Sequence, residues 1–253
     1  MAKVFLITGA SRGIGKATAI LAAQKGFDVV VNYVNSEKDA QELVAEIHAL
    51  GRRAIAVRAD VTIEEEAISL FKTVVAKLGN IDVLVNNVGY MPHVSLVKDM
   101  TIDRFNLTLY RNVGSTFICS REAVKIMSTK NGGTGGAIIN VSSIAARMGS
   151  AHRYVDYAAA KAAIDTFTKG LAIEVAEEGI RVNAVRPSYI YTDLHAGIGE
   201  RVEIKRAEME KNIPMKRGGT PLEVATAIVW LASEEASFVT GVSAKGKCHP
   251  LTG

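Results

Sequence analysis

Short apolar runs alternate with longer amphipathic stretches along the chain, and this alternation restricts the possible folds more than any single motif does. The apolar runs show no regular polar alternation, which is typical of strands that are covered on both faces. They predict strands at 4–8, 28–33, 54–57, 81–85, 137–141 and 180–185. Strand followed by helix throughout indicates a parallel sheet with helices on both sides, an α/β doubly wound fold. Ligands of such folds bind beyond the carboxyl ends of the strands.

The amphipathic stretches between these runs predict the helices. They lie at 14–25, 36–50, 62–78, from 101, from 112, through the region of Tyr157 to about 178, and from 221. Two starts carry capping motifs. The segment Thr62-Ile63-Glu64-Glu65 reads as a capping box, and Thr220-Pro221-Leu222-Glu223 combines an N-cap, a proline at the first helical position and a glutamate at the third.

Size and charge set the domain number and the class of partner. The chain has 253 residues, with no repeat, low-complexity tract or linker, so we expect a single domain over residues 1–253. Lysine and arginine number 30 and aspartate and glutamate 26, a net charge of +4 that is scattered along the sequence. Because nucleic-acid binding usually needs a basic stripe, the charge argues against a nucleic-acid partner.

The cysteines and the apolar runs indicate a cytoplasmic protein. Cys119 and Cys248 form no disulfide framework, as expected in a reducing compartment. No apolar run approaches the roughly 18 residues of a membrane span, so no membrane association is expected. Cys248 and His249 are adjacent but have no further ligands nearby, so no metal site is expected.

A glycine motif follows the first predicted strand in the segment Thr8-Gly9-Ala10-Ser11-Arg12-Gly13-Ile14-Gly15. Glycines at such a strand-to-helix junction allow a tight turn and the close approach of a pyrophosphate to the helix N-terminus. Three residues separate the first two glycines and one separates the last two, which differs from the common dinucleotide fingerprint. A glycine-rich turn without a ligand is the alternative.

Polar residues also follow the third and fourth predicted strands. Asp60 follows the third strand, and Asn86-Asn87-Val88-Gly89 follows the fourth. A nucleotide bound at the carboxyl ends would lie beside both segments, and Asp60 could accept a hydrogen bond from an adenine amino group. Equally, Asp60 could cap a loop, and the asparagines could satisfy turn backbone groups.

Tyr157 and Lys161 stand four residues apart in Tyr157-Ala158-Ala159-Ala160-Lys161. This spacing places both side chains on one face of a helix. An ammonium beside a phenol favours the phenolate, so we expect the pKa of Tyr157 to fall toward neutrality. A phenol poised in this way can pass a proton to or from an alcohol oxygen. Chance placement on an alanine-rich helix is the alternative for the pair taken alone.

Taken together, these motifs resemble the short-chain dehydrogenase/reductase family. The matching features occur in family order between residue 3 and about residue 241: the glycine motif, Asp60, Asn86 to Gly89, Asn112, Ser142-Ser143, Tyr157, Lys161 and the stretch from Pro187 to Thr192. Segments such as Val31-Asn32-Tyr33 are similar to bacterial glucose dehydrogenase-like and 3-oxoacyl-carrier-protein reductase-like members. The resemblance implies a Rossmann-type domain with a mostly parallel seven-stranded sheet in the order 3-2-1-4-5-6-7.

The resemblance also implies the roles of the site residues. Tyr157 would be the general acid/base, Lys161 would lower its pKa and hold the nicotinamide ribose, and Ser143 would hydrogen-bond the substrate oxygen. Ser142 is the rival for that serine role, and Asn112 would anchor a water that relays protons to Lys161. Thr192 and the backbone of Ile190 would bind the nicotinamide carboxamide. The full set of implied cofactor contacts is Gly9, Ser11, Arg12, Gly13, Ile14, Gly15, Asp60, Val61, Asn87, Gly89, Tyr157, Lys161, Pro187, Ile190 and Thr192.

The choice of nicotinamide cofactor depends on the end of the second predicted strand. Family members that use NAD usually carry an aspartate there, which accepts from the ribose 2′-hydroxyl. In this chain the position is occupied by Tyr33, and Asn32 before it is also neutral. Arg12 is placed to attract a 2′-phosphate, although a solvated turn residue is the alternative. We therefore expect NADP(H) to be favoured, with NAD(H) possible.

The resemblance implies an oxidoreductase that acts on CH–OH donors and transfers hydride between NADP(H) and a ketone or secondary alcohol. The alternative is a catalytically silent NADP(H)-sensing binding protein on the same fold. A small-molecule carbonyl or alcohol substrate, a substrate lid near 193–215, and a homotetramer or homodimer are also implied. The motifs do not discriminate between a sugar, an acyl thioester and a steroid.

Three features depart from the family pattern. Val88 replaces the usual alanine of the Asn-Asn-Ala-Gly motif and is expected to narrow the space near the cofactor. Ser188 replaces the glycine after Pro187, which would cost on the order of a kcal/mol if the position needs a positive φ. The C-terminal segment from Val242 to Pro250 carries lysines where relatives have an apolar strand.

Overall fold

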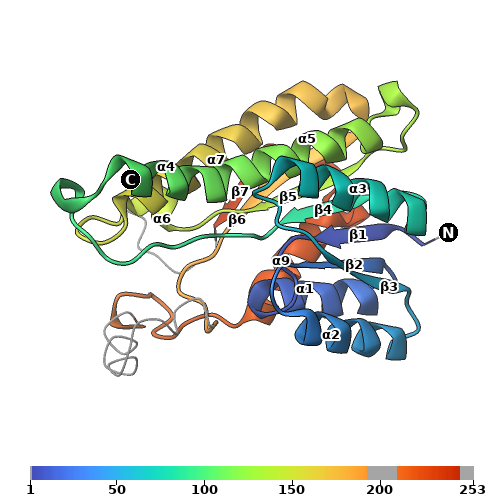
Figure 1. Cartoon of the computed structure of the whole chain (residues 1–253), viewed down its shortest axis with the longest axis horizontal. Coiled ribbons are helices and arrows are strands. Elements are labelled where there is room, and N and C mark those ends of the chain that lie inside the picture. The colour runs from blue at the N-terminus through green and yellow to red at the C-terminus, as the bar shows by residue number, and fades with distance from the viewer. Residues whose placement is uncertain (1, 193–209, 246–253) are drawn as a thin grey trace.

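A seven-stranded parallel sheet forms the centre of the computed structural model, which describes residues 2–192 and 210–245 (Figure 1). The strand order is β3-β2-β1-β4-β5-β6-β7, and all the pairings between neighbours are parallel. The strands are β1 (Val4–Ile7), β2 (Asp28–Tyr33), β3 (Ala54–Arg58), β4 (Val83–Asn86), β5 (Gly136–Val141), β6 (Ile180–Arg186) and β7 (Ser243–Lys245). The predicted fold class and strand order are confirmed.

Alternate residues of each strand point to two separate cores. In β1, Phe5 and Ile7 belong to one core, whereas Val4 and Leu6 belong to the other. All four side chains are buried, because helices cover both faces of the sheet. This double coverage explains why the strands read as continuous apolar runs in the sequence.

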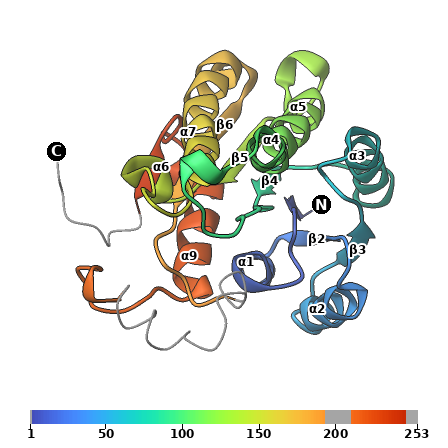
Figure 2. The same cartoon turned by 60° about the vertical axis from the view of Figure 1, so that its left-hand side comes forward.

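The helices form one layer on each face of the sheet, and the two layers are visible in both views (Figures 1 and 2). Helices α1, α2 and α9 pack on one face, and α3, α5 and α7 pack on the other. Their bounds are α1 (Gly13–Gln24), α2 (Glu37–Ala49), α3 (Glu64–Leu78), α4 (Ile102–Leu109), α5 (Ser115–Met127), α6 (Ala145–Met148), α7 (Val155–Val175) and α9 (Pro221–Ala232). Short helical turns lie at η1 (Val97–Asp99), η2 (Tyr110–Gly114), η3 (Thr129–Asn131), η4 (Ala176–Glu178) and η6 (Glu234–Ala236).

The start of α3 differs from the predicted capping box. Helix α3 begins at Glu64 with Ile63 as its N-cap residue, and no side chain caps it. The Thr62 hydroxyl instead donates to Asp60 Oδ1 at 2.7 Å, and the Asp60 amide donates to Glu66 Oε2 at 2.8 Å. Thr62 is therefore part of an Asp60-centred turn before the helix.

The start of α9 follows its prediction. Thr220 Oγ1 accepts from the Glu223 amide at 3.3 Å, and Glu223 Oε2 accepts from the Thr220 amide at 2.8 Å. Both bonds of a capping box are present, with Pro221 at the first helical position.

Two predicted helices, from 101 and from 112, are joined in the structure. Thr101 is the N-cap of α4, and its hydroxyl accepts from the Arg104 amide. A π-helical turn, η2, continues α4 directly into α5, and Asn112 lies inside this turn. Such turns widen a helix locally and frequently occur at functional sites.

The segment expected to form a lid lies mostly outside the described residues. Residues 193–209 are not described, whereas 210–215 are, and part of this stretch borders the cavity discussed below. In the described ranges, no helix combines the length and the apolar character needed to cross a bilayer.

Candidate active site

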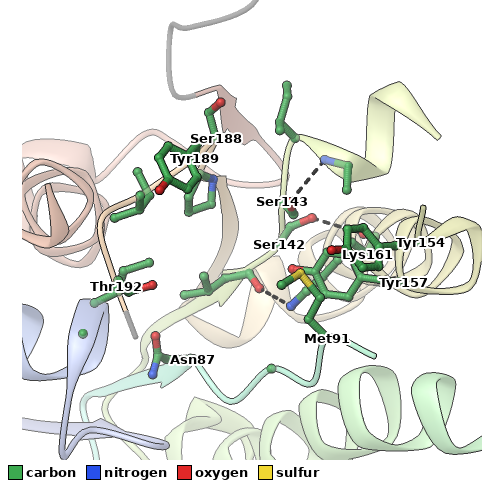
Figure 3. A pocket seen from close by; sticks show the side chains of 18 of the residues that line it. Asn87, Met91, Ser142, Ser143, Tyr154, Tyr157, Lys161, Ser188, Tyr189 and Thr192 are labelled. Atoms are coloured by element: carbon green, nitrogen blue, oxygen red, sulfur yellow. Dashed lines mark hydrogen bonds between the residues drawn. The ribbon is translucent and has the colours of Figure 1, made fainter. Parts of the chain in front are cut away.

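A cavity of about 1220 Å³ opens at the carboxyl ends of the central strands. Its wall is built from the loop after β1, the end of β2, the loop after β4, the end of β5, the start of α7 and the segment after β6. In the close view, Tyr157, Tyr154, Lys161 and Ser143 gather on one side, with Asn87 and Thr192 on the other (Figure 3). Most of the predicted site residues line it: Gly9, Ser11, Arg12, Gly13, Ile14, Asn87, Gly89, Ser143, Tyr157, Lys161, Pro187, Ile190 and Thr192.

The glycine motif forms the turn between β1 and α1. Gly9 and Gly13 have φ values of +60° and +56°, in the left-handed region that favours glycine. Gly15 serves close packing instead, because a Cβ on this residue would lie 2.6 Å from the Gly9 carbonyl oxygen. Arg12 is the N-cap residue of α1 and makes no side-chain cap bond, and the first turn of α1 contains no acidic residue. The positive end of this helix therefore faces the cavity, and no carboxylate of the described residues lines the cavity there.

Side chains after β4 hold the glycine turn in place. Asn87 Nδ2 donates to the carbonyl oxygens of Thr8 and Gly9 at 2.9 and 3.0 Å. Thr8 Oγ1 accepts from the amides of Asn87 and Val88 at 3.0 and 3.2 Å. A Cβ on Gly9 would lie 3.1 Å from Val88 Cγ2, so the extra methyl groups of Val88 do narrow the space beside the turn.

The cavity wall is positively charged. Arg12, Arg153, Lys161 and Lys211 line it, and no carboxylate does so among the described residues. Tyr33 occupies the wall at the end of β2. The neighbouring Asn32 is buried, and its side chain bonds the Gly9 amide and the carbonyl oxygens of Val57 and Ala59.

Tyr157 and Lys161 lie one turn apart on α7, as their spacing predicts. Lys161 Nζ lies 5.6 Å from the centre of the Tyr157 ring and donates to the Val141 carbonyl oxygen at 2.9 Å. Lys161 is 2% exposed, and Tyr157 is partly accessible from the cavity.

The predicted lowering of the Tyr157 pKa is wrong for this arrangement. Burial raises the pKa of Tyr157 to about 12, and a hydrogen bond with the Ser143 side chain opposes the rise only in part. Burial also lowers the pKa of Lys161 to about 8, opposed by the charge of Asp165. Removal of the phenol from water is the largest cause of the Tyr157 shift, and the Lys161 ammonium donates to the Val141 carbonyl oxygen instead of to the phenol.

The two adjacent serines have different surroundings. Ser142 is buried, and its hydroxyl donates to the Lys161 carbonyl oxygen at 3.1 Å. Ser143 Oγ accepts from the Ala145 amide at 3.2 Å and is the hydrogen-bonding neighbour of Tyr157. Because the Ser143 oxygen accepts from an amide, its single hydrogen is the donor in the bond to the Tyr157 phenol, the direction that favours the phenolate.

Asn112 is buried in the π-helical turn and lies behind the cavity wall. Its Nδ2 donates to the carbonyl oxygens of Tyr90 and Thr108, both at 2.8 Å, and its Oδ1 accepts from the Tyr90 amide at 3.1 Å. A Cβ on Gly89 would lie 3.6 Å from Lys161 Nζ and 3.7 Å from Asn112 Oδ1, so both atoms lie close to Gly89.

Three residues expected to contact the cofactor do not line the cavity: Gly15, which packs against the glycine turn, and Asp60 and Val61. The Asp60 carboxylate accepts from the amide and the hydroxyl of Thr62, at 2.9 and 2.7 Å. Val61 is 2% exposed, and neither residue belongs to the cavity wall as described.

Ser188 causes no backbone strain, because it is not among the described non-glycine residues with positive φ. It lines the cavity together with Met91, Tyr154 and Tyr189, three residues that sequence reasoning missed. Tyr154 stands one helical turn before Tyr157, so the i, i+3 spacing could have indicated it. Met91 and Tyr189 lie in loops and carry no comparable signal.

No group of three histidine, cysteine, aspartate or glutamate side chains that could hold a metal occurs in the described ranges.

Comparison with known proteins agrees with this geometry. A family model described as enoyl-(acyl carrier protein) reductase, of the short-chain dehydrogenase type, matches residues 9–244. The chain belongs to the short-chain dehydrogenase/reductase family. It is thus an oxidoreductase that acts on alcohol or ketone groups, and its family uses NAD(H) or NADP(H).

Relatives within this family cover nearly the whole chain. The uncharacterized oxidoreductase YgfF of Escherichia coli (strain K12) is 50% identical over 238 residues, which cover 94% of this chain and 96% of YgfF. A 3-oxoacyl-[acyl-carrier-protein] reductase of Synechocystis sp. is 41% identical, and the match covers 95% of this chain and 93% of the reductase. The crystal structure of acetoin dehydrogenase YohF from Salmonella typhimurium has a TM-score of 0.85 at 35% identity, covering 97% of this chain and 95% of that chain.

Proposed function

We propose that this oxidoreductase transfers hydride reversibly between NADP(H) and a ketone or secondary alcohol. The observation that carries the proposal is the meeting of Tyr157, Ser143 and Lys161 in the same cavity as the glycine turn. The phenol provides the proton that a carbonyl reduction needs, and the glycine turn provides the anion site that a dinucleotide needs.

The cavity suits a dinucleotide by its own features. The pyrophosphate would be held by the turn that contains Gly9 and Gly13, both with positive φ, and by the start of α1, which has no side-chain cap. Lys161 would hold the nicotinamide ribose. Thr192, which lies across the cavity from Tyr157, would hold the carboxamide together with the backbone of Ile190. When bound, the nicotinamide supplies or accepts the hydride.

The remaining steps belong to the protein side chains. Because burial raises the pKa of Tyr157 to about 12, the phenol is protonated near neutral pH and donates its proton to the carbonyl oxygen during reduction. With substrate bound, Ser143 would donate its hydroxyl hydrogen to the same oxygen instead of to the phenol, and so stabilise the charge that develops there. In the reverse direction Tyr157 must first lose its proton and then acts as the base.

Asn112 would support proton supply to Lys161. Both hydrogens of its Nδ2 are used by Tyr90 and Thr108, so a water on this side chain would have to donate to Oδ1. That atom and Lys161 Nζ both border Gly89, which supports the placement of a relay water between them.

Substitution of Tyr157 tests the reaction. The assay follows NADPH absorbance with a 3-oxoacyl thioester and NADP⁺ reduction with acetoin, substrates suggested by the names of the relatives. Tyr157→Phe should bind NADPH with an unchanged Kd and lose at least 100-fold in kcat. Near-normal turnover by Tyr157→Phe would refute the role. A wild-type protein that binds NADPH but turns over no ketone or alcohol would favour the silent binding protein instead.

The preference for NADP(H) is supported by Arg12, by Tyr33 at the end of β2 and by the absence of carboxylates from the described cavity wall. Wild-type protein should show a lower KM for NADPH than for NADH. Arg12→Ala should raise the KM for NADPH about tenfold, the loss expected for one charge-assisted bond, and leave the KM for NADH unchanged. Tighter use of NADH by the wild type would overturn this preference.

Assembly, domain organisation and location are also proposals. We expect a cytoplasmic homotetramer or homodimer in which residues 1–253 form one domain and 193–215 contribute a substrate lid. Light scattering on a size-exclusion column would measure the oligomer, and a single cooperative unfolding transition would support one domain.

A further inference from the structure

A buried ion pair adjoins Tyr157 and has no role in the proposed proton transfer. Asp156 immediately precedes Tyr157 on α7, and its side chain is fully buried. Arg104 of α4 binds this carboxylate with two nitrogens, Nε to Oδ2 at 2.8 Å and Nη2 to Oδ1 at 3.4 Å. The pair joins α4 to α7 at the point where the proposed acid enters the cavity.

The same carboxylate fixes the backbone of Tyr157. Asp156 Oδ1 accepts from the Tyr157 amide at 3.0 Å. This amide is among the first of α7 and has no carbonyl partner within the helix. The N-cap residue Tyr154 makes no side-chain cap bond, so Asp156 takes that place for Tyr157.

The network also extends to Asn112. The Thr108 hydroxyl lies 2.8 Å from the Arg104 carbonyl oxygen and 3.4 Å from Asp156 Oδ2. The Thr108 carbonyl oxygen accepts from Asn112 Nδ2. One cluster, defined by Arg104, Thr108 and Asp156, therefore contacts the backbone of the proposed acid and the side chain of the proposed relay residue.

Burial of this cluster costs desolvation free energy that a purely structural contact between α4 and α7 would not need. Arg104 is 11% exposed, and its buried Nη1 has no hydrogen-bond partner among residues 2–192 and 210–245. Buried ion pairs rarely stabilise a protein more than apolar side chains of the same volume would. Burial alone would raise the pKa of Asp156, but the bonds from Arg104 and from the Tyr157 amide lower it, so the carboxylate stays charged.

We propose that Arg104 and Asp156 are positioning residues that fix the Tyr157 phenol relative to the reacting oxygen. This inference rests on the proposed function and extends it to residues that do not reach the cavity. A displacement of about 1 Å at a reacting group can cost on the order of 100-fold in rate, so a rigid anchor beside Tyr157 is sufficient to control kcat.

Three variants and a matched control test the proposal. Arg104→Met removes the charge, Arg104→Met/Asp156→Asn removes both charges, and Arg104→Lys keeps one bond. The control is Asp28→Asn, because Asp28 is also a buried carboxylate bound by two arginine bonds at 2.6 and 2.7 Å, but it begins β2, away from the carboxyl ends. The measurements are Tm, the Kd of NADPH, and kcat and KM with acetoin and with a 3-oxoacyl thioester.

Arg104→Met and the double variant should lose at least tenfold in kcat while the Kd of NADPH changes less than twofold. The double variant leaves no unpaired charge and should recover Tm relative to Arg104→Met, yet keep the low kcat. Arg104→Lys should restore part of kcat, and Asp28→Asn should lower Tm with a normal kcat for the folded protein. A double variant with kcat within twofold of the wild type would overturn the proposal.

A measurement without turnover separates this inference from the proposed function. In protein labelled with ¹³C at tyrosine Cζ, Tyr157→Phe identifies the Tyr157 resonance. That resonance should shift or broaden in the double variant and remain in place in Asp28→Asn. An unchanged resonance would refute the positioning role even if no substrate is found, whereas an inactive wild type with a shifted resonance would refute only the proposed function.

Discussion

Gly15 offers a sharp test of how the glycine turn is held, because its hydrogen faces backbone atoms. A Cβ at this position would lie 2.6 Å from the Gly9 carbonyl oxygen, 2.8 Å from Asn87 Nδ2 and 2.9 Å from Ala10 Cα. None of these atoms is the free end of a flexible side chain, since Asn87 Nδ2 is itself bonded to Thr8 and Gly9. Gly15→Ala must therefore move either the turn or the start of α1.

The magnitude follows from two opposing effects. Alanine gains up to about 1 kcal/mol over glycine in a helix interior, and overpacking costs roughly 1–3 kcal/mol. The gain is small at Gly15 because the residue lies in the first turn of α1, so we expect a net loss of about 1–2 kcal/mol. Gly170 is the matched control, because it lies in α7 with nothing within 4 Å of a built Cβ. Gly170→Ala should stabilise by roughly 0.5–1 kcal/mol.

The assay is urea unfolding at one fixed protein concentration, combined with NADPH titration of each folded variant. Gly15→Ala should also weaken NADPH binding about tenfold, equivalent to about 1.4 kcal/mol, because the displaced turn is the proposed pyrophosphate site. Gly170→Ala should leave the Kd unchanged. If Gly15→Ala is as stable as Gly170→Ala and binds NADPH normally, the reasoning from close packing is refuted.

Three further predictions concern charge and capping. Since Tyr157 has a raised pKa, oxidation of acetoin should accelerate from pH 6 to pH 8, whereas ketone reduction should not. Initial rates measured in both directions would check this, and an oxidation rate that does not change with pH would contradict it. Burial raises the pKa of Asp28 but the bonds from Arg53 and Arg52 outweigh it, so the net pKa is lowered. The Asp28 carboxylate therefore stabilises the folded protein above its unfolded pKa, and this stabilisation is lost as the pH falls through its folded pKa. The unfolding free energies of wild type and Asp28→Asn should differ by about 1–3 kcal/mol at pH 7 and converge in acid. Thr220→Ala should cost about 1 kcal/mol through loss of the α9 cap with kcat intact, and an unchanged Tm would count against the capping box.

The fold was predictable because its signals are local and repeated. Continuous apolar runs located β1 to β6 within a few residues, whereas β7 (Ser243–Lys245) was expected only from the family resemblance. The parallel arrangement then followed from the helices between the strands. The start of α3 was mispredicted because two side chains compete there: Asp60 binds Thr62, and Glu66 binds the Asp60 amide. Such competition depends on where the turn lies in space, which a four-residue motif does not specify.

The candidate site was predictable in its membership but less so in its contacts. Residues at the carboxyl ends of β1, β4 and β5 must converge in a parallel sheet, and Asn87 and Ser143 do so. The use of Asn87 to hold the Thr8 and Gly9 carbonyl oxygens depends on the register between β1 and β4, which is a tertiary feature. The Arg104–Asp156 pair joins residues 52 positions apart and has no local signature.

The pair Tyr157 and Lys161 shows where sequence spacing stops being informative about chemistry. A separation of four residues fixes which helix face the two side chains share, but the direction of the ammonium is set by the Val141 carbonyl oxygen at the end of β5. The pKa of the phenol is set by the walls that bury it, and these come from several segments of the chain. Because burial favours the neutral form of each group, it keeps the proton on Tyr157 while bringing the pKa of Lys161 to about 8. We therefore expect the protein without ligands to hold Tyr157 ready as an acid, so that at neutral pH carbonyl reduction needs no prior titration of the phenol and alcohol oxidation does.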